Sequence, residues 1–145
     1  MLKKTITYTD FDGNKRTEDA YFNLLQSEAV ELALELPEGL FDSVNDKKTD
    51  EETAATLIEK LGGKGVYGFI KDLVLKSYGI KSSDGRRLEK SDEISKEFSQ
   101  TVAFDTFLMG LMSDDKAAAE FVTKVIPPEL ADKMAARNAS PASTN

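Results

Sequence analysis

The chain of 145 residues contains 40% hydrophobic and 31% charged residues, a composition typical of one globular domain rather than a disordered chain. Its net charge of −7 argues against a nucleic-acid backbone or an anionic membrane as the partner. The absence of cysteine excludes disulfides, and the absence of histidine removes the commonest metal ligand and general base. No apolar run approaches the roughly 18 residues that a membrane span requires.

Residues 3–24 predict a β-hairpin. Apolar and polar side chains alternate on both sides of Asp12-Gly13, which is a strong signal for a two-residue turn. The return arm directs three apolar side chains to one side: Ala20, Phe22 and Leu24. Because a two-stranded ribbon is not stable alone, we expect the hairpin to pack on helices.

Two motifs superficially resemble ligand sites. The DFDGNKRTED segment resembles an EF-hand loop, but with Gly13 at the sixth loop position, Tyr8 occupies the first, where calcium requires a carboxylate. Residues 63–68 match GxGxxG, but a dinucleotide site needs a preceding strand, and here a helical pattern precedes the motif. We interpret the first motif as a turn and the second as a helix–helix turn in which Gly68 allows close packing.

Two helices are predicted in the first half of the chain. Apolar spacing indicates a helix at residues 26–36, ended by Pro37. A second helix begins with the capping box Thr49-x-x-Glu52 and is closed by Gly62.

Residues 66–78 predict the central helix. Their apolar residues cover a wide arc and leave Ser77 among a few residues on the solvent side. Gly79 suits the left-handed residue that closes a helix. The turn signal Ser83-Asp84-Gly85 then predicts a short surface ribbon.

The last third of the chain predicts further helices. Ser91 caps a helix whose apolar residues continue to Met112 on two faces. Another helix starts at Ser113-Asp114 and is stopped by Pro127-Pro128, after which Leu130 and Met134 suggest a final turn. Residues 137–145 are predicted to form a disordered tail.

Two segments carry a resemblance to a known family. KKTITYTDFDGNKRTEDAYFNL resembles the start of the tail assembly chaperones of long-tailed (siphovirus-type) bacteriophages or prophages, and FIKDLVLKSYGIKSSDGRRLEKSDEISKEFSQTVAFDTFLMGLMSDDKAAAEFVTKVIP is similar to their remaining body. The segments cover most of the chain between Lys3 and Pro127. The chain departs from the family at Leu25, where a Ser or Thr helix cap is usual, which leaves Asn23 or Ser27 to cap the helix.

The expected fold is mainly α: a single domain at residues 1–136, with a bundle of about five or six helices and the hairpin of residues 3–24 packed on it. The resemblance implies a chaperone that binds the tape measure protein in the host bacterial cytoplasm, keeps it soluble and promotes tail tube polymerisation around it. Such proteins are absent from the mature virion. In this family a longer frameshifted product often recruits the tail tube protein.

A chaperone of this kind needs an apolar strip that accepts a partner helix. We expect five residues to supply the strip: Phe104, Phe107, Leu108, Leu111 and Phe121. The equally weighted alternative places all five in the internal core, and self-association through the same strip is a further alternative. The basic residues Arg86, Arg87 and Lys90 are interpreted as solvated loop charges in preference to a site for an acidic partner.

The sequence does not predict an enzyme, a metal site or a cofactor. Helical carboxylate pairs such as Glu31 and Glu35 fall on the predicted solvent side, where carboxylates keep ordinary pKa values. Two other functions remain. A structural neck or tail-completion protein would be found in purified virions. An acidic inhibitor of a basic host protein is disfavoured because the carboxylates are spread over several helices.

Overall fold

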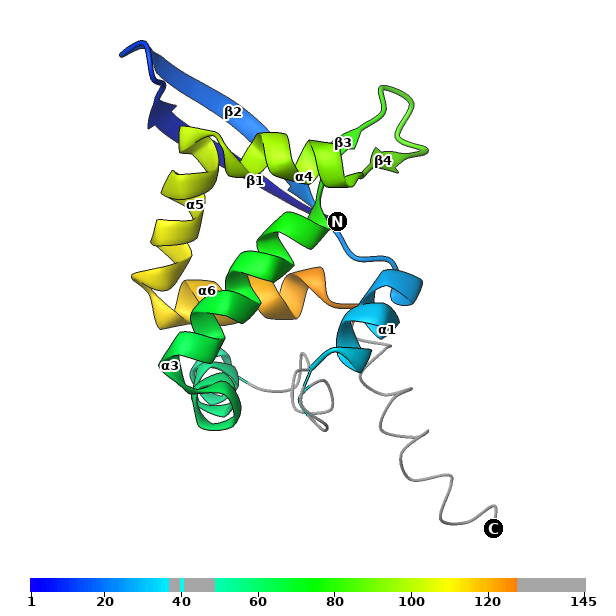
Figure 1. Ribbon diagram of the computed structural model, residues 1–145, viewed down its shortest axis with the longest axis vertical. Helices are drawn as coiled ribbons and strands as arrows, with labels where there is room; N and C mark the ends of the chain where they lie inside the picture. The colour runs from blue at the N-terminus through cyan, green and yellow to red at the C-terminus, as the bar shows by residue number, and fades with distance from the viewer. Residues whose placement is uncertain (37–39, 41–48, 128–145) are drawn as a thin grey trace.

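The computed structural model describes residues 1–36, 40 and 49–127, which form five α-helices and a four-stranded antiparallel sheet (Figure 1). The strands are β1 (Leu2–Thr9), β2 (Lys15–Phe22), β3 (Tyr78–Lys81) and β4 (Leu88–Glu89). The helices are α1 (Gln26–Leu34), α3 (Asp50–Ser77), α4 (Asp92–Ser99), α5 (Val102–Met112) and α6 (Asp115–Val125). They cross one another around α3 (Figure 1).

The mainly α fold with an N-terminal hairpin therefore agrees with the prediction, whereas the bundle arrangement of the helices stays a prediction. The predicted domain limit at residue 136, the turn through Leu130 and Met134 and the tail at 137–145 lie outside the described residues.

The hairpin is confirmed, but its turn differs from the expected two-residue type. β1 and β2 pair from Leu2 opposite Phe22 to Thr9 opposite Lys15, which leaves a loop at residues 10–14. The carbonyl of Asp10 accepts the N–H of Gly13 at 3.0 Å, and the Asp10 carboxylate accepts the Asp12 and Asn14 N–H groups at 2.9 and 2.8 Å. Gly13 has a φ of 85°. Asp10 organises this loop because an Asp side chain readily bonds the backbone two residues further on.

The sheet continues beyond the hairpin through pairs that the sequence did not indicate. Tyr21 pairs with Gly79 on β3, and β3 pairs with β4, so the predicted surface ribbon is the other half of the sheet. Gly79 does not close α3 in the left-handed conformation, because the positive-φ glycines among the described residues are Gly13, Gly62 and Gly85. Glycine is required there by close approach, since a Cβ would lie 2.6 Å from Leu88 Cγ.

The helices predicted on either side of Gly62 are joined in α3. Gly62 interrupts the helix with φ 73° and ψ 166°. The Thr49 cap is confirmed, since Thr49 Oγ1 accepts the Glu52 N–H at 3.1 Å. The expected close packing at Gly68 is wrong, because an added Cβ would meet nothing within 4 Å.

The apolar stretch after Ser91 forms two helices instead of one. α4 ends at Ser99, and Thr101 caps α5 by accepting the Phe104 N–H at 3.1 Å. Ser77 was expected on the solvent side but is fully buried, and its hydroxyl donates to the Leu73 carbonyl at 2.6 Å. α4 packs against this end of α3 through a bond from Ser95 Oγ to the Leu75 carbonyl at 3.0 Å.

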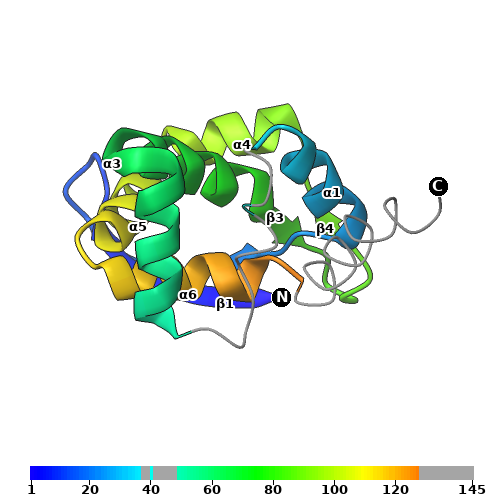
Figure 2. The same cartoon turned by 90° about the horizontal axis from the view of Figure 1, so that it is seen from below.

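An aromatic cluster occupies the centre of the core. It consists of Phe22 of β2 and the rings that contact Phe22 directly or through a neighbour: Tyr78, Phe98, Phe104, Phe107 and Phe121. Phe22 lies 4.9 Å from the Phe107 ring and 5.4 Å from the Phe121 ring, measured between centroids. In both views α5 lies on the side of the molecule opposite to α1 and the β3–β4 hairpin (Figures 1 and 2). The part of the cluster that α5 contributes therefore lies away from the α1 side.

Candidate functional site

The five residues predicted to bind a partner lie on α5 and α6, and four of them are buried in the core. The exposed fractions are 7% for Phe104, 3% for Leu108, 5% for Leu111 and 1% for Phe121. Phe107 is half-buried and stacks on Phe22. In the described fold these four residues thus lie in the internal core, which is where the alternative prediction puts them. A contribution to partner binding stays a prediction, because contact with a partner would require α5 or α6 to move.

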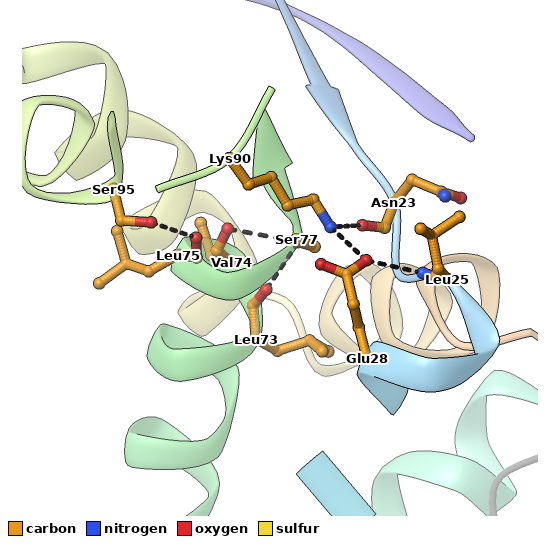
Figure 3. Close-up of polar contacts among 9 residues, drawn as sticks. All are labelled: Asn23, Leu25, Glu28, Leu73, Val74, Leu75, Ser77, Lys90 and Ser95. Carbon is orange, nitrogen blue, oxygen red and sulfur yellow. Dashed lines mark hydrogen bonds and ion pairs between the residues drawn. The ribbon is translucent and has the colours of Figure 1, made fainter. Parts of the chain in front are cut away.

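An ion pair between α1 and the segment before α4 organises the opposite side of the molecule. Lys90 Nζ donates to Glu28 Oε1 at 2.8 Å and to the carbonyl of Asn23 (Figure 3). The Lys90 side chain is only 17% exposed, and that of Glu28 is 32% exposed. Glu28 Oε1 also accepts the Leu25 N–H at 2.9 Å. The pair therefore joins the connector after β2, the first turn of α1 and the start of α4.

The first of two hollows flanking this ion pair is a groove of about 670 Å³, which we name the Arg86 groove. It lies between the β3–β4 hairpin and the first turns of α1 and α4. Its apolar lining residues are Leu25, Leu88 and Ile94, and its charged ones are Glu28, Arg86, Arg87, Glu89 and Lys90. A groove with an apolar lining and several convergent charges is suited to binding another molecule.

The second hollow, which we name the Glu31 hollow, has a volume of about 290 Å³ and the opposite balance of charge. Four carboxylates and two lysines line it: Glu28, Glu31, Glu35, Asp92, Lys76 and Lys90. Lys76 Nζ pairs with Glu35 Oε2 at 2.9 Å. The Glu28–Lys90 pair thus separates a mainly acidic hollow from a groove with more basic than acidic side chains.

The β3–β4 turn positions the basic side chains of the Arg86 groove. Asp84 Oδ1 accepts the Arg86 N–H at 3.1 Å and the Ser82 hydroxyl at 2.7 Å. The bond from the Arg86 N–H, followed by that from Ser82, lowers the pKa of the Asp84 carboxyl. Ser82 Oγ also accepts the Arg87 N–H at 3.0 Å. The backbone that carries both arginines is therefore fixed by hydrogen bonds.

The three basic residues grouped by the sequence have different environments. Lys90 is largely buried in its pair with Glu28. Arg87 pairs with Glu89 at 3.3 Å on the surface. Arg86 is exposed, and no ion pair to its guanidinium is found among residues 1–36, 40 and 49–127. The interpretation as solvated loop charge therefore fails for Lys90, which has a structural role that only the fold reveals.

The start of α1 also differs from the expectation. Neither Asn23 nor Ser27 caps the helix; Leu25 is the N-cap residue, with no side-chain cap bond. Glu28 accepts the Leu25 N–H, as the acidic member of a capping box does. The Leu25 side chain is 61% exposed and lines the Arg86 groove. An apolar residue at a position that favours Ser or Thr was the signal in the sequence for this groove.

Neither reactive nor metal-binding groups are gathered at this site. Within the described ranges, no group of three or more His, Cys, Asp or Glu side chains is arranged to hold a metal ion. The helices of the same ranges include none that is long and apolar enough to span a lipid bilayer. The described residues form a small, mainly helical domain with an open groove beside α1.

Comparison with family models identifies the class. The model described as "phage tail assembly chaperone" matches residues 1–145, so the chain belongs to that family. The role of this family is in assembly and is not catalytic. The comparisons with curated proteins and with solved structures gave no match.

Proposed function

We propose that this chaperone binds the tape measure protein, keeps it soluble in the host cytoplasm and promotes polymerisation of the tail tube around it. The observation that carries the proposal is the family match over the whole chain. The Arg86 groove supports it, because an open groove with an apolar lining can hold one face of a helical polypeptide. The net charge of −7 favours solubility of a complex with an apolar client.

Further parts of the proposal concern the assembly pathway. A longer frameshifted product recruits the tail tube protein, and the chaperone leaves before the virion is complete. The Arg86 groove is accessible in the described fold. The four buried residues of α5 and α6, by contrast, contact the client only in a state in which these helices separate from the core.

Co-expression tests the proposal directly. The tape measure protein of the same phage is produced alone, with this chain, or with an unrelated acidic protein of similar size. We expect this chain, and not the unrelated protein, to raise the soluble fraction of the tape measure protein and to co-purify with it. Equal solubility in all three cultures and no co-purification would reject the proposal.

Purified virions separate the proposal from its rival. A chaperone that leaves the tail is not detected in particles by mass spectrometry. Detection of the chain at a fixed copy number in every particle would favour a structural neck or tail-completion protein.

A further inference from the structure

We propose that the Arg86 groove holds an amphipathic segment of the client whose apolar side packs on Leu25 and whose polar side presents Asp or Glu residues to Arg86 and Arg87. This inference rests on the proposed function, because it specifies which segments of the client are held. It assigns client binding to the region around α1, β4 and α4 and not to α5 and α6.

Leu25 is the first reason for placing the contact here. The Leu25-x-x-Glu28 sequence makes only half of a capping box, because Glu28 accepts the Leu25 N–H while leucine offers no acceptor to the helix. A serine would complete the box, so the chain forgoes a cap bond at this position. In exchange, a large apolar side chain is 61% exposed beside the groove. A residue that is unfavourable for the isolated chain is expected where a partner covers it.

Charge is the second reason. The chain has a net charge of −7, yet three of the five charged side chains that line this groove are basic. The Arg86 guanidinium has no ion-pair partner in the described part of the chain, and Arg87 is paired only with the exposed Glu89. Arginine binds carboxylates with paired hydrogen bonds, so acidic side chains are the natural complement of this edge.

The groove is also built on fixed elements. The Asp84 carboxylate and the Ser82 hydroxyl hold the Arg86 and Arg87 backbone N–H groups, and Lys90 ties the other wall to Glu28 at 2.8 Å (Figure 3). A preorganised surface loses little conformational entropy on binding. Because Glu28 and Glu89 lie in the same lining, a phosphate backbone would meet repulsion there, and a polypeptide with both apolar and acidic residues fits better.

A peptide binding experiment with charge reversal tests the inference. Overlapping peptides covering the tape measure protein are titrated with the full chain, and affinity is measured by fluorescence anisotropy. We expect the tightest peptides to be amphipathic and acidic on their polar side. The Arg86→Glu/Arg87→Glu double variant should bind them about tenfold or more weakly, as expected for loss of charge-assisted hydrogen bonds. The matched control, Lys60→Glu/Lys64→Glu, changes the net charge by the same amount on the exposed surface of α3. Its affinity for the peptides should remain near that of the wild type.

A substitution at Leu25 tests the apolar half. Leu25→Ser completes the capping box, so its melting temperature should equal or exceed that of the wild type while its affinity falls roughly tenfold, as for truncation of an interface anchor. Leu25→Met keeps an apolar side chain and should bind like the wild type. A loss of affinity without a loss of stability cannot be ascribed to unfolding.

The outcomes distinguish this inference from the proposed function. If the wild type binds neither the peptides nor the full-length tape measure protein, the proposed function fails. If the wild type binds the full-length protein and the Arg86/Arg87 and Leu25→Ser variants bind it equally well, the inference is overturned and the proposed function stands. If sedimentation shows that the groove variants lose self-association but keep client binding, the occupant of the groove is a second copy of this chain. That result also overturns the inference.

Discussion

The aromatic cluster and the Arg86 groove both contain apolar side chains, but they differ in what covers these side chains. Phe22 and Phe121 of the cluster are at most 1% exposed, since β2, α4, α5 and α6 enclose them. In the groove, Leu25 is 61% exposed and charged side chains surround it. A high density of aromatic residues therefore marked the core, whereas the candidate partner surface is marked by one apolar residue at a polar position.

The largest expected effect concerns the cluster. Phe121→Ala should lower the free energy of unfolding by about 3–5 kcal/mol, because it leaves a cavity among fully buried rings. Urea denaturation measures the change. The matched control is Phe11→Ala, which truncates a phenylalanine that is 83% exposed at the hairpin tip and should change stability by less than about 0.5 kcal/mol. If the Phe121→Ala variant kept the stability of the wild type but no longer bound the tape measure protein, Phe121 would belong to a partner surface.

A smaller effect is expected at the ion pair beside the groove. Lys90→Met leaves the half-buried Glu28 carboxylate and the Asn23 carbonyl without this donor. The free energy of unfolding should fall by about 1–3 kcal/mol, the usual range for stranding a buried polar group. Lys76→Met removes the exposed pair with Glu35 and should cost no more than about 0.5 kcal/mol. Equal effects of the two substitutions would show that Lys90 does not hold α1 to α4.

The smallest effect concerns the protonation of Asp84 in the β3–β4 turn. Its pKa is lowered from the ordinary 3.8, first by the Arg86 N–H and then by the Ser82 hydroxyl. Folding therefore favours the ionised form. The resulting stabilisation is present above the unfolded pKa and is lost as the pH falls through the lower folded pKa. Carboxyl NMR titration should give a midpoint below 3.8, and Ser82→Ala should raise it. A midpoint at or above 3.8 in the wild type would contradict the hydrogen-bonded turn.

Much of the local structure was predictable because its signals act over a few residues. The hairpin, the Thr49 cap and the break at Gly62 follow from side-chain acceptors and glycine conformations near them in the chain. The break at Thr101 was also encoded, as a Thr N-cap, but the continuous apolar pattern across it favoured a single helix.

The faces of α5 were less predictable. Periodicity indicated an apolar face through Phe104 and Leu108 and another that includes Met109. It could not say which one the core would cover. The structure buries the first and leaves Met109 53% exposed.

The sequence by itself determined most of the helix and turn positions, the acidic character and, through its motifs, the family. Only the tertiary structure decided that β2 pairs with β3 and that α5 turns its aromatic face inward. It also decided that Lys90 binds Glu28, 62 residues away in the chain. This ion pair lies between the Arg86 groove and the Glu31 hollow. The physical reason is that these features depend on contacts between segments distant in the chain. Local periodicity records which residues are apolar, but not which neighbour covers them.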